Sequence, residues 1–205
     1  MIGKPASRLF LGLAVLVAAL QSAALAYIVV ARDRLLKTGR EVVLSVTPVD
    51  PRDLFRGDYV TLGYDITRIS GEALGPKGDV PDGIERGGTF YAVLSLDGAS
   101  NTWRITRVSA RFPDDVAASE AVIKGRVRAL YDLGRASPGE AAAGKTLVAR
   151  YGIETYFVPE GTGKVLEDKV RSAAIKAIVA LGADGTAALK GLIVDGERRD
   201  LPAIF

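Results

Sequence analysis

The sequence predicts a mainly antiparallel β domain, a barrel or a sandwich, behind one N-terminal transmembrane helix. Three observations predict this class: one long apolar run near the start, short segments in which apolar and polar residues alternate, and Gly-, Pro- or Asp-containing turns between them. An α+β fold is the alternative, because one short segment also has helical spacing. The 205 residues suffice for one anchor and one domain of about 160 residues.

The apolar run contains only Gln21 and Ser22 as polar residues. A helix of this length, at about 1.5 Å per residue, crosses a hydrocarbon layer of roughly 30 Å. A cleaved signal peptide is the alternative, because residues 24–26 have the small-x-small form, but the apolar run continues past that position. We therefore expect a leader at residues 1–8, a transmembrane helix at 9–31, a juxtamembrane linker at 32–40 and a β-rich domain at 41–205.

Basic residues lie on both sides of the apolar run. Counted literally, the positive-inside rule would keep the C-terminal domain in the cytoplasm, because more cations lie after the run than before it. A hydrophobic segment behind a short basic leader is also typical of a signal anchor, which exports the domain behind it. We therefore expect a single-pass protein of the bacterial inner (cytoplasmic) membrane with a periplasmic domain. The cations in question are Lys4, Arg8, Arg32, Arg34, Lys37 and Arg40.

Charge and composition exclude several classes of function. Of the 27 basic and 24 acidic residues, six basic and one acidic lie in residues 1–40, which leaves 21 and 23 for the rest. A near-neutral domain lacks the basic footprint of a nucleic-acid-binding protein, so nucleic acid is not an expected partner. The chain has no Cys and no His, which excludes thiol nucleophiles, disulfides and His-based triads or metal sites. No cofactor is predicted.

The most informative segment is residues 48–68, PVDPRDLFRGDYVTLGYDITR. Its two prolines exclude a helix at its start, and Gly57-Asp58 forms a corner. The alternation after this corner predicts a strand whose apolar set, with Tyr64, faces the core.

This segment resembles the GDYXXLXY family, because GDYVTLGY fits the GDY-x-x-L-x-Y signature through Gly57, Asp58, Tyr59, Leu62 and Tyr64. A second block at residues 151–168, YGIETYFVPEGTGKVLED, is similar to the C-terminal half of that family, so the resemblance covers roughly residues 40–196. The resemblance implies a bacterial membrane-anchored domain that often occurs beside polytopic membrane proteins. The expected partners are therefore the bilayer and a polytopic membrane protein; the resemblance supplies no catalytic or binding residues.

Elsewhere, alternation predicts short strands separated by turns, and the only Trp, Trp103, is expected in the core on the same strand face as Ile105. Residues 71–88, with six glycines and two prolines, predict a mobile loop. Residues 136–144 are small and flexible, and residues 164 to about 173 have helical spacing. The eight predicted strands are residues 41–47, 58–67, 89–96, 102–110, 121–131, 151–158, 174–181 and 187–194.

One predicted strand carries a row of cations, Lys124, Arg126 and Arg128, on the face opposite its apolar residues. Such a row can contact lipid phosphates or an acidic partner. A solvated strand face is the ordinary interpretation of the same pattern.

The candidate interaction residues are acidic, basic and aromatic side chains in the two blocks, which we expect to meet in space. Together they would form either a specific binding surface or a contact that stabilises the fold. No metal site is predicted, because no EF-hand spacing is present and Gly163-Lys164 lacks the rest of a phosphate-loop pattern; a bound cation or anionic ligand remains an alternative. The candidates are Asp50, Arg52, Asp53, Arg56, Asp58, Tyr59, Tyr64 and Asp65 in the first block and Glu154, Tyr156, Glu160 and Glu167 in the second.

The favoured interpretation is an extracytoplasmic interaction or assembly module with no evident catalytic site. The enzyme alternative is a membrane-anchored Ser/Lys peptidase similar to signal peptidases, because Ser45-Val46-Thr47-Pro48 resembles their Ser-x-x-Pro segment. Ser45 would then be the nucleophile, and Lys124 its base if burial deprotonates it.

Overall fold

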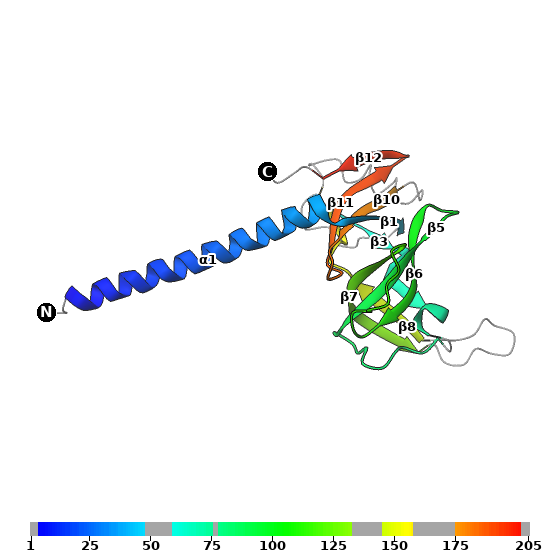
Figure 1. The fold of residues 1–205 in the computed structure, drawn as a ribbon, viewed down its shortest axis with the longest axis horizontal. Coiled ribbons are helices and arrows are strands. Elements are labelled where there is room, and N and C mark those ends of the chain that lie inside the picture. Colours follow the sequence, from blue (N-terminus) through cyan, green and yellow to red (C-terminus); the bar gives the residue numbers. More distant parts are fainter. Residues whose placement is uncertain (1–3, 48–58, 76–77, 133–144, 158–174, 202–205) are drawn as a thin grey trace.

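The structure is a computed structural model, and it describes residues 4–47, 59–75, 78–132, 145–157 and 175–201. One long helix, α1 (Lys4–Thr38), projects from the side of a β domain (Figure 1). Its apolar part lies entirely outside the domain core and is long and apolar enough to cross a membrane. The helix covers the whole predicted span and continues beyond it.

The helix does not end at a flexible connection. Residues 32–38, expected within a linker, form its last two turns, and only Gly39 separates it from the first strand, β1 (Arg40–Thr47). Within these turns Arg32 donates a hydrogen bond to the carbonyl of Ala187 at 3.2 Å. A methyl group on Gly182 would come within 3.3 Å of Leu35 Cδ1, so the helix packs closely on the domain here.

The first sheet joins β1 to the C-terminal strands in the antiparallel order β12-β11-β10-β1-β3. The predicted first strand and the C-terminal hairpin are confirmed, with a turn at residues 182–186. The last strand of the chain, β12 (Glu197–Asp200), was not predicted, because its four exposed polar residues show no alternation. The remaining members are β3 (Gly63–Tyr64), β10 (Ile175–Leu181), β11 (Ala187–Val194) and β12 (Glu197–Asp200).

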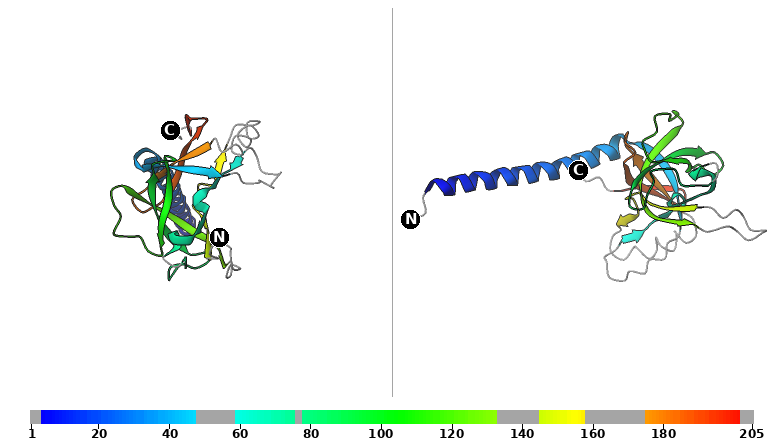
Figure 2. Two further views of the ribbon diagram at one scale, coloured as in Figure 1. Left: turned by 90° about the vertical axis from the view of Figure 1, so that its right-hand side faces the viewer. Right: turned by 90° about the horizontal axis from the view of Figure 1, so that it is seen from below.

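The second sheet has the antiparallel order β4-β8-β7-β5-β6 and curls into half a barrel (Figure 2). The predicted hairpin around Trp103 and the cation-bearing strand are confirmed as members of this sheet. A separate ribbon pairs β2 (Tyr59–Thr61) with β9 (Thr155–Phe157). The mainly β fold class is therefore confirmed, and the members of the second sheet are β4 (Arg68–Ser70), β5 (Thr89–Asp97), β6 (Thr102–Ser109), β7 (Glu120–Asp132) and β8 (Lys145–Arg150).

The core lies between the two sheets and is centred on large buried side chains such as Phe90 and Leu44. Phe90 packs edge-on against Tyr151, with ring centroids 6.1 Å apart. Gly125 makes this contact possible, because a Cβ at that position would lie 2.5 Å from the Phe90 ring. Trp103 packs against the rim of the core only partly buried, with the Arg40 guanidinium 5.1 Å from its ring centre.

The prediction of one continuous strand at residues 58–67 is wrong. Among the described residues the chain forms β2, then β3, then a 3-10 turn at Asp65–Thr67, because it passes from one partner strand to another: β2 pairs with β9, β3 with β1, and β4 with β8. The described members of the predicted inward set, Leu62, Tyr64 and Ile66, are nevertheless buried as predicted.

Four further predictions need correction or lie outside the described residues. The strand predicted at residues 151–158 begins only at Thr155, because a turn with Gly152 at a φ of +79° precedes it, and β8 was missed. In the loop predicted at residues 71–88, the side chains of Leu74 and Ile84 are buried in the core. The predicted helix at residues 164–173 and the small-residue stretch at 136–144 lie outside the described part of the chain.

In the first sheet, a carboxylate near the start of β1 links this strand to β11 and β12. Glu41 accepts two hydrogen bonds from Arg198, at 3.0 and 3.1 Å, and lies 2.7 Å from Lys190 Nζ. These hydrogen bonds, from Arg198 first and Lys190 second, lower the pKa of Glu41 to about 2 from an ordinary 4.5. The Glu41 carboxylate therefore binds a proton more tightly in the unfolded chain than in the folded chain.

We expect Glu41→Gln to lower the free energy of unfolding by about 1 kcal/mol at pH 7, because a pair this exposed is screened by water. Since the pKa is depressed in the folded state, the stabilisation is complete above pH 4.5 and is lost as the pH falls toward 2. Urea denaturation of the detergent-solubilised chain should therefore give two curves that differ at pH 7 and converge near pH 2. Glu197→Gln, at an exposed and longer ion pair, is the control; a constant difference at all pH values would refute the assignment.

Candidate interaction site

The two sequence blocks meet in space, as expected, wherever both are described. In the β2–β9 ribbon Tyr59 is paired with Phe157 and Thr61 with Thr155. Beyond the ribbon the Leu62 amide donates to the carbonyl of Glu154 at 2.8 Å, which continues the pairing by one residue. The first block is therefore bound to the second along its backbone.

Two tyrosines reinforce this junction, because each donates a hydrogen bond to a backbone carbonyl of the other block. The Tyr64 hydroxyl donates to the Ile153 carbonyl at 2.7 Å, and the Tyr151 hydroxyl donates to the Ile66 carbonyl at 2.8 Å. Both rings are almost completely buried. Burial, and to a lesser degree the negative charge of Glu154, raises the pKa of both hydroxyls, so both stay protonated donors. We call these two bonds the tyrosine latch.

Glu154 supports the latch from the second block. Its carboxylate accepts hydrogen bonds from the amides of Tyr151 and Gly152. These bonds hold the tight turn that places the Tyr151 ring and the Ile153 carbonyl opposite the first block. Glu154 therefore has a structural role in the described molecule.

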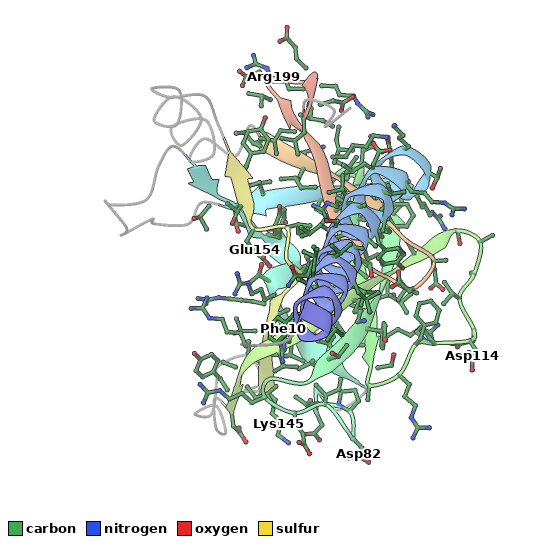
Figure 3. The ribbon with its side chains drawn as sticks, turned by 90° about the vertical axis from the view of Figure 1, so that its left-hand side faces the viewer. Phe10, Asp82, Asp114, Lys145, Glu154 and Arg199 are labelled. Carbon is green, nitrogen blue, oxygen red and sulfur yellow. The ribbon has the colours of Figure 1, made fainter. Side chains whose placement is uncertain are left out.

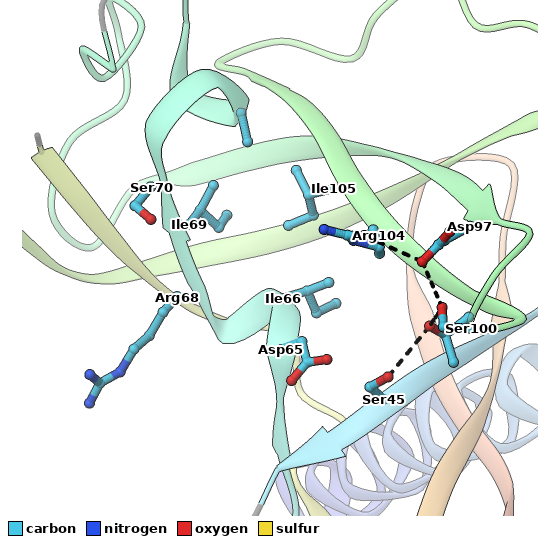
Figure 4. A pocket seen from close by; sticks show the side chains of 12 residues that line it. Ser45, Asp65, Ile66, Arg68, Ile69, Ser70, Asp97, Ser100, Arg104 and Ile105 are labelled. Atoms are coloured by element: carbon cyan, nitrogen blue, oxygen red, sulfur yellow. Dashed lines mark hydrogen bonds and ion pairs between the residues drawn. The ribbon is translucent and has the colours of Figure 1, made fainter. Parts of the chain in front are cut away.

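Beside the junction an open pocket of about 430 Å³ lies between β1, β6 and residues 65–73 (Figure 4). Its apolar lining comes from Ile66, Ile69 and Ile105, and its rim carries Asp65 and Arg104. Arg68 also borders the pocket, but its side chain points away from it (Figure 4). A concave surface with an apolar lining and charges of both signs suits a peptide segment better than a uniformly charged ligand.

A row of hydroxyl groups crosses one end of this pocket. Thr102 Oγ1 lies 3.4 Å from Ser45 Oγ and 2.7 Å from Ser100 Oγ, and the Ser100 hydroxyl donates to Asp97 at 2.9 Å. The Lys176 ammonium donates to the Ser100 carbonyl at 2.8 Å. The row closes the β5–β6 hairpin against β1. Sequence reasoning missed it, because 57 residues separate Ser45 from Thr102 and no local pattern marks it.

The structure does not bring Ser45 and Lys124 together. Ser45 is paired with Lys176 near the start of β10, whereas the Lys124 amide donates to Gly185, in the turn after β10. At about 3.3 Å per residue, the strand from Lys176 to Leu181 alone spans roughly 17 Å. The Lys124 side chain is also exposed.

The remaining predicted residues divide into described and undescribed ones. Asp65 is exposed on the pocket rim, and Tyr156 is half-buried on β9. Tyr59 is described only through its backbone in β2. Among the described residues no group of three acidic side chains is close enough to hold a metal ion. The candidates outside the described residues are Asp50, Arg52, Asp53, Arg56, Asp58, Glu160 and Glu167.

We expect Tyr64→Phe and Tyr151→Phe each to lower the free energy of unfolding by about 1–3 kcal/mol, because each leaves a buried carbonyl without its donor. The two losses should not be additive, since both bonds join the same two segments. Chemical denaturation of the two single variants and the double variant measures this coupling. Tyr131→Phe, at a ring that is 55 % exposed, is the matched control; losses no larger than the control's would refute the latch.

Comparison with known proteins places this chain in one family. No curated protein and no solved structure matches it. A family model described as GDYXXLXY protein matches residues 21–192, which include the end of α1, both blocks and most of the β domain. Because this match covers most of the chain, the chain belongs to the GDYXXLXY protein family.

Proposed function

We propose that this chain is a single-pass protein of the bacterial inner membrane whose periplasmic β domain binds a polytopic membrane protein as an interaction or assembly module. The observation that carries the proposal is the continuous connection between α1 and the domain through Gly39. Because the last turns of the helix pack on Ala187 and Gly182, the domain stays beside the bilayer. Integral membrane partners present their loops in that layer.

The pocket supplies the surface for such a loop. It lies open beside the tyrosine latch. The nearly buried Ile66 and Ile69 form its apolar floor, and the partly exposed Ile105 offers apolar area that a partner side chain can cover. Asp65 and Arg104 at the rim provide charges that can fix the register of a bound segment. A peptidase is not supported, because Ser45 and Lys124 lie near opposite ends of β10.

Topology reporters fused after residue 205 test the membrane side. We expect a phosphatase that is active only in the periplasm to be active, and a fluorescent protein that fails to fold after export to be dark. The reverse pattern would place the domain in the cytoplasm and refute the exported orientation. Fractionation of the same cells, with carbonate washing of the membranes, checks that α1 is retained as an anchor.

Co-purification from native membranes tests the pocket. We expect the wild-type chain to retain a polytopic membrane protein, and Asp65→Ala with Ile105→Asp to retain at least tenfold less, because the second substitution places a charge in the apolar lining. The control is Glu85→Ala with Arg86→Ala, two exposed charges on another loop. Equal recovery with the pocket variant would refute this surface.

A further inference from the structure

Four cations share one face of the second sheet, and we call this set, Arg68, Lys124, Arg126 and Arg150, the basic face. Residues directly opposite each other in an antiparallel pair lie on the same side of the sheet. Arg126 on β7 is opposite Arg150 on β8, and Arg68 on β4 is opposite Val148, two residues before Arg150. Lys124 precedes Arg126 by two residues and so shares its side. All four side chains are exposed, as is that of the adjacent Arg128 in the β7 bulge.

The fold compensates this positive charge only in part: Arg150 lies within ion-pair distance of Glu154, and Lys124 and Asp184 attract each other. Like charges directly opposite each other destabilise a strand pair, yet Arg126 faces Arg150. Arg126 donates to the Gly87 carbonyl, and Arg150 lies 3.8 Å from Glu154, whose oxygens already accept backbone amides. Within the described residues neither Arg68 nor Lys124 forms an ion pair. The nearby carboxylate of Asp184 is held by the amide and hydroxyl of Thr186.

The basic face lies on the side of the domain from which α1 projects. The Lys124 amide donates to Gly185, so the β10–β11 turn lies against the start of β7. The same turn packs on α1 through Gly182 and Leu35. Figure 1 shows β7 on the flank that faces the helix, and Figure 3 views the domain from this flank, along α1. With α1 in a bilayer, the basic face therefore lies near the headgroups.

An aromatic pair borders the basic face. Tyr91 is opposite Lys124 in the sheet, and its ring packs edge-on against Phe112, with centroids 5.5 Å apart. Phe112 is 40 % exposed. Aromatic rings with an apolar body are enriched at the level of lipid headgroups. Cations beside partly exposed aromatic rings suit a membrane surface.

We propose that the basic face binds the anionic phospholipid headgroups of the leaflet from which α1 emerges. This inference rests on the membrane anchoring proposed above. The planar guanidinium groups of Arg126 and Arg150 suit bidentate contact with phosphate, and a phosphate between them removes their mutual repulsion. Basic residues held near an anionic membrane surface each add to its attraction. Binding there fixes the tilt of the domain on the membrane.

The test uses the full chain in nanodiscs. Because the chain has no Cys, Thr89→Cys places a single fluorophore on the strand residue opposite Arg126. Nitroxide-labelled headgroups in the discs quench the fluorescence of this label only when the basic face touches the lipid surface. We expect at least twofold more quenching in discs with about one third phosphatidylglycerol than in pure phosphatidylcholine. High salt should remove the difference.

The variant Lys124→Gln, Arg126→Gln, Arg150→Gln should lose the extra quenching without a lower melting temperature, because it also removes the like-charge pair. The control removes three cations elsewhere: Lys145→Gln, Lys176→Gln, Arg199→Gln. Equal quenching in both lipids, or in variant and wild type, overturns the inference. If the fluorophore stays unquenched in anionic discs but is shielded from solvent in native membranes, the basic face binds a protein partner. This result also overturns the inference. A chain that fails to enter discs refutes the anchor itself.

Discussion

The two hydrogen bonds of the tyrosine latch, from Tyr64 to the Ile153 carbonyl and from Tyr151 to the Ile66 carbonyl, are the contact on which the rest of the domain depends. Each hydroxyl reaches a carbonyl in the other block, so the segment that leaves the first sheet is closed onto the segment that leaves the second. A buried carbonyl without a donor is costly, whereas a satisfied one contributes modestly. The latch therefore acts mainly by excluding arrangements in which the blocks separate, and it explains why the GDY-x-x-L-x-Y tyrosine at Tyr64 lies inside the domain.

The attachment of α1 gives this closed domain an orientation. The helix ends one residue before β1, and its last turns contact the β10–β11 hairpin. That hairpin also lies against β7, so the side of the second sheet that carries Arg126 is placed beside the helix. The pocket opens elsewhere, and Arg68 on the strand between them points away from it (Figure 4). The domain thus separates a surface proposed for lipid from a surface proposed for a protein partner.

Several features were predictable because they depend on local patterns. The apolar run predicted the spanning helix, alternation predicted β1, the hairpin at Trp103 and the C-terminal hairpin, and the spacing of Leu62, Tyr64 and Ile66 predicted which side chains are buried. The continuous strand at residues 58–67 was wrong because alternation records burial but not the partner strand. Along residues 59–70 the same side of the chain faces the core, while β2 pairs with β9, β3 with β1 and β4 with β8.

The sequence by itself determined the family, the β class, the single apolar helix and the inward faces of β1, of residues 62–66 and of β7, since these depend on the order of residues along a few turns or strands. Only the tertiary structure decided which distant groups meet: the reciprocal tyrosine bonds, the hydroxyl row from Ser45 to Asp97 and the Arg126–Arg150 pair. The physical reason is strand register. A shift of one residue turns every side chain to the other face, and register is set by the packing of the whole sheet rather than by neighbours in the chain.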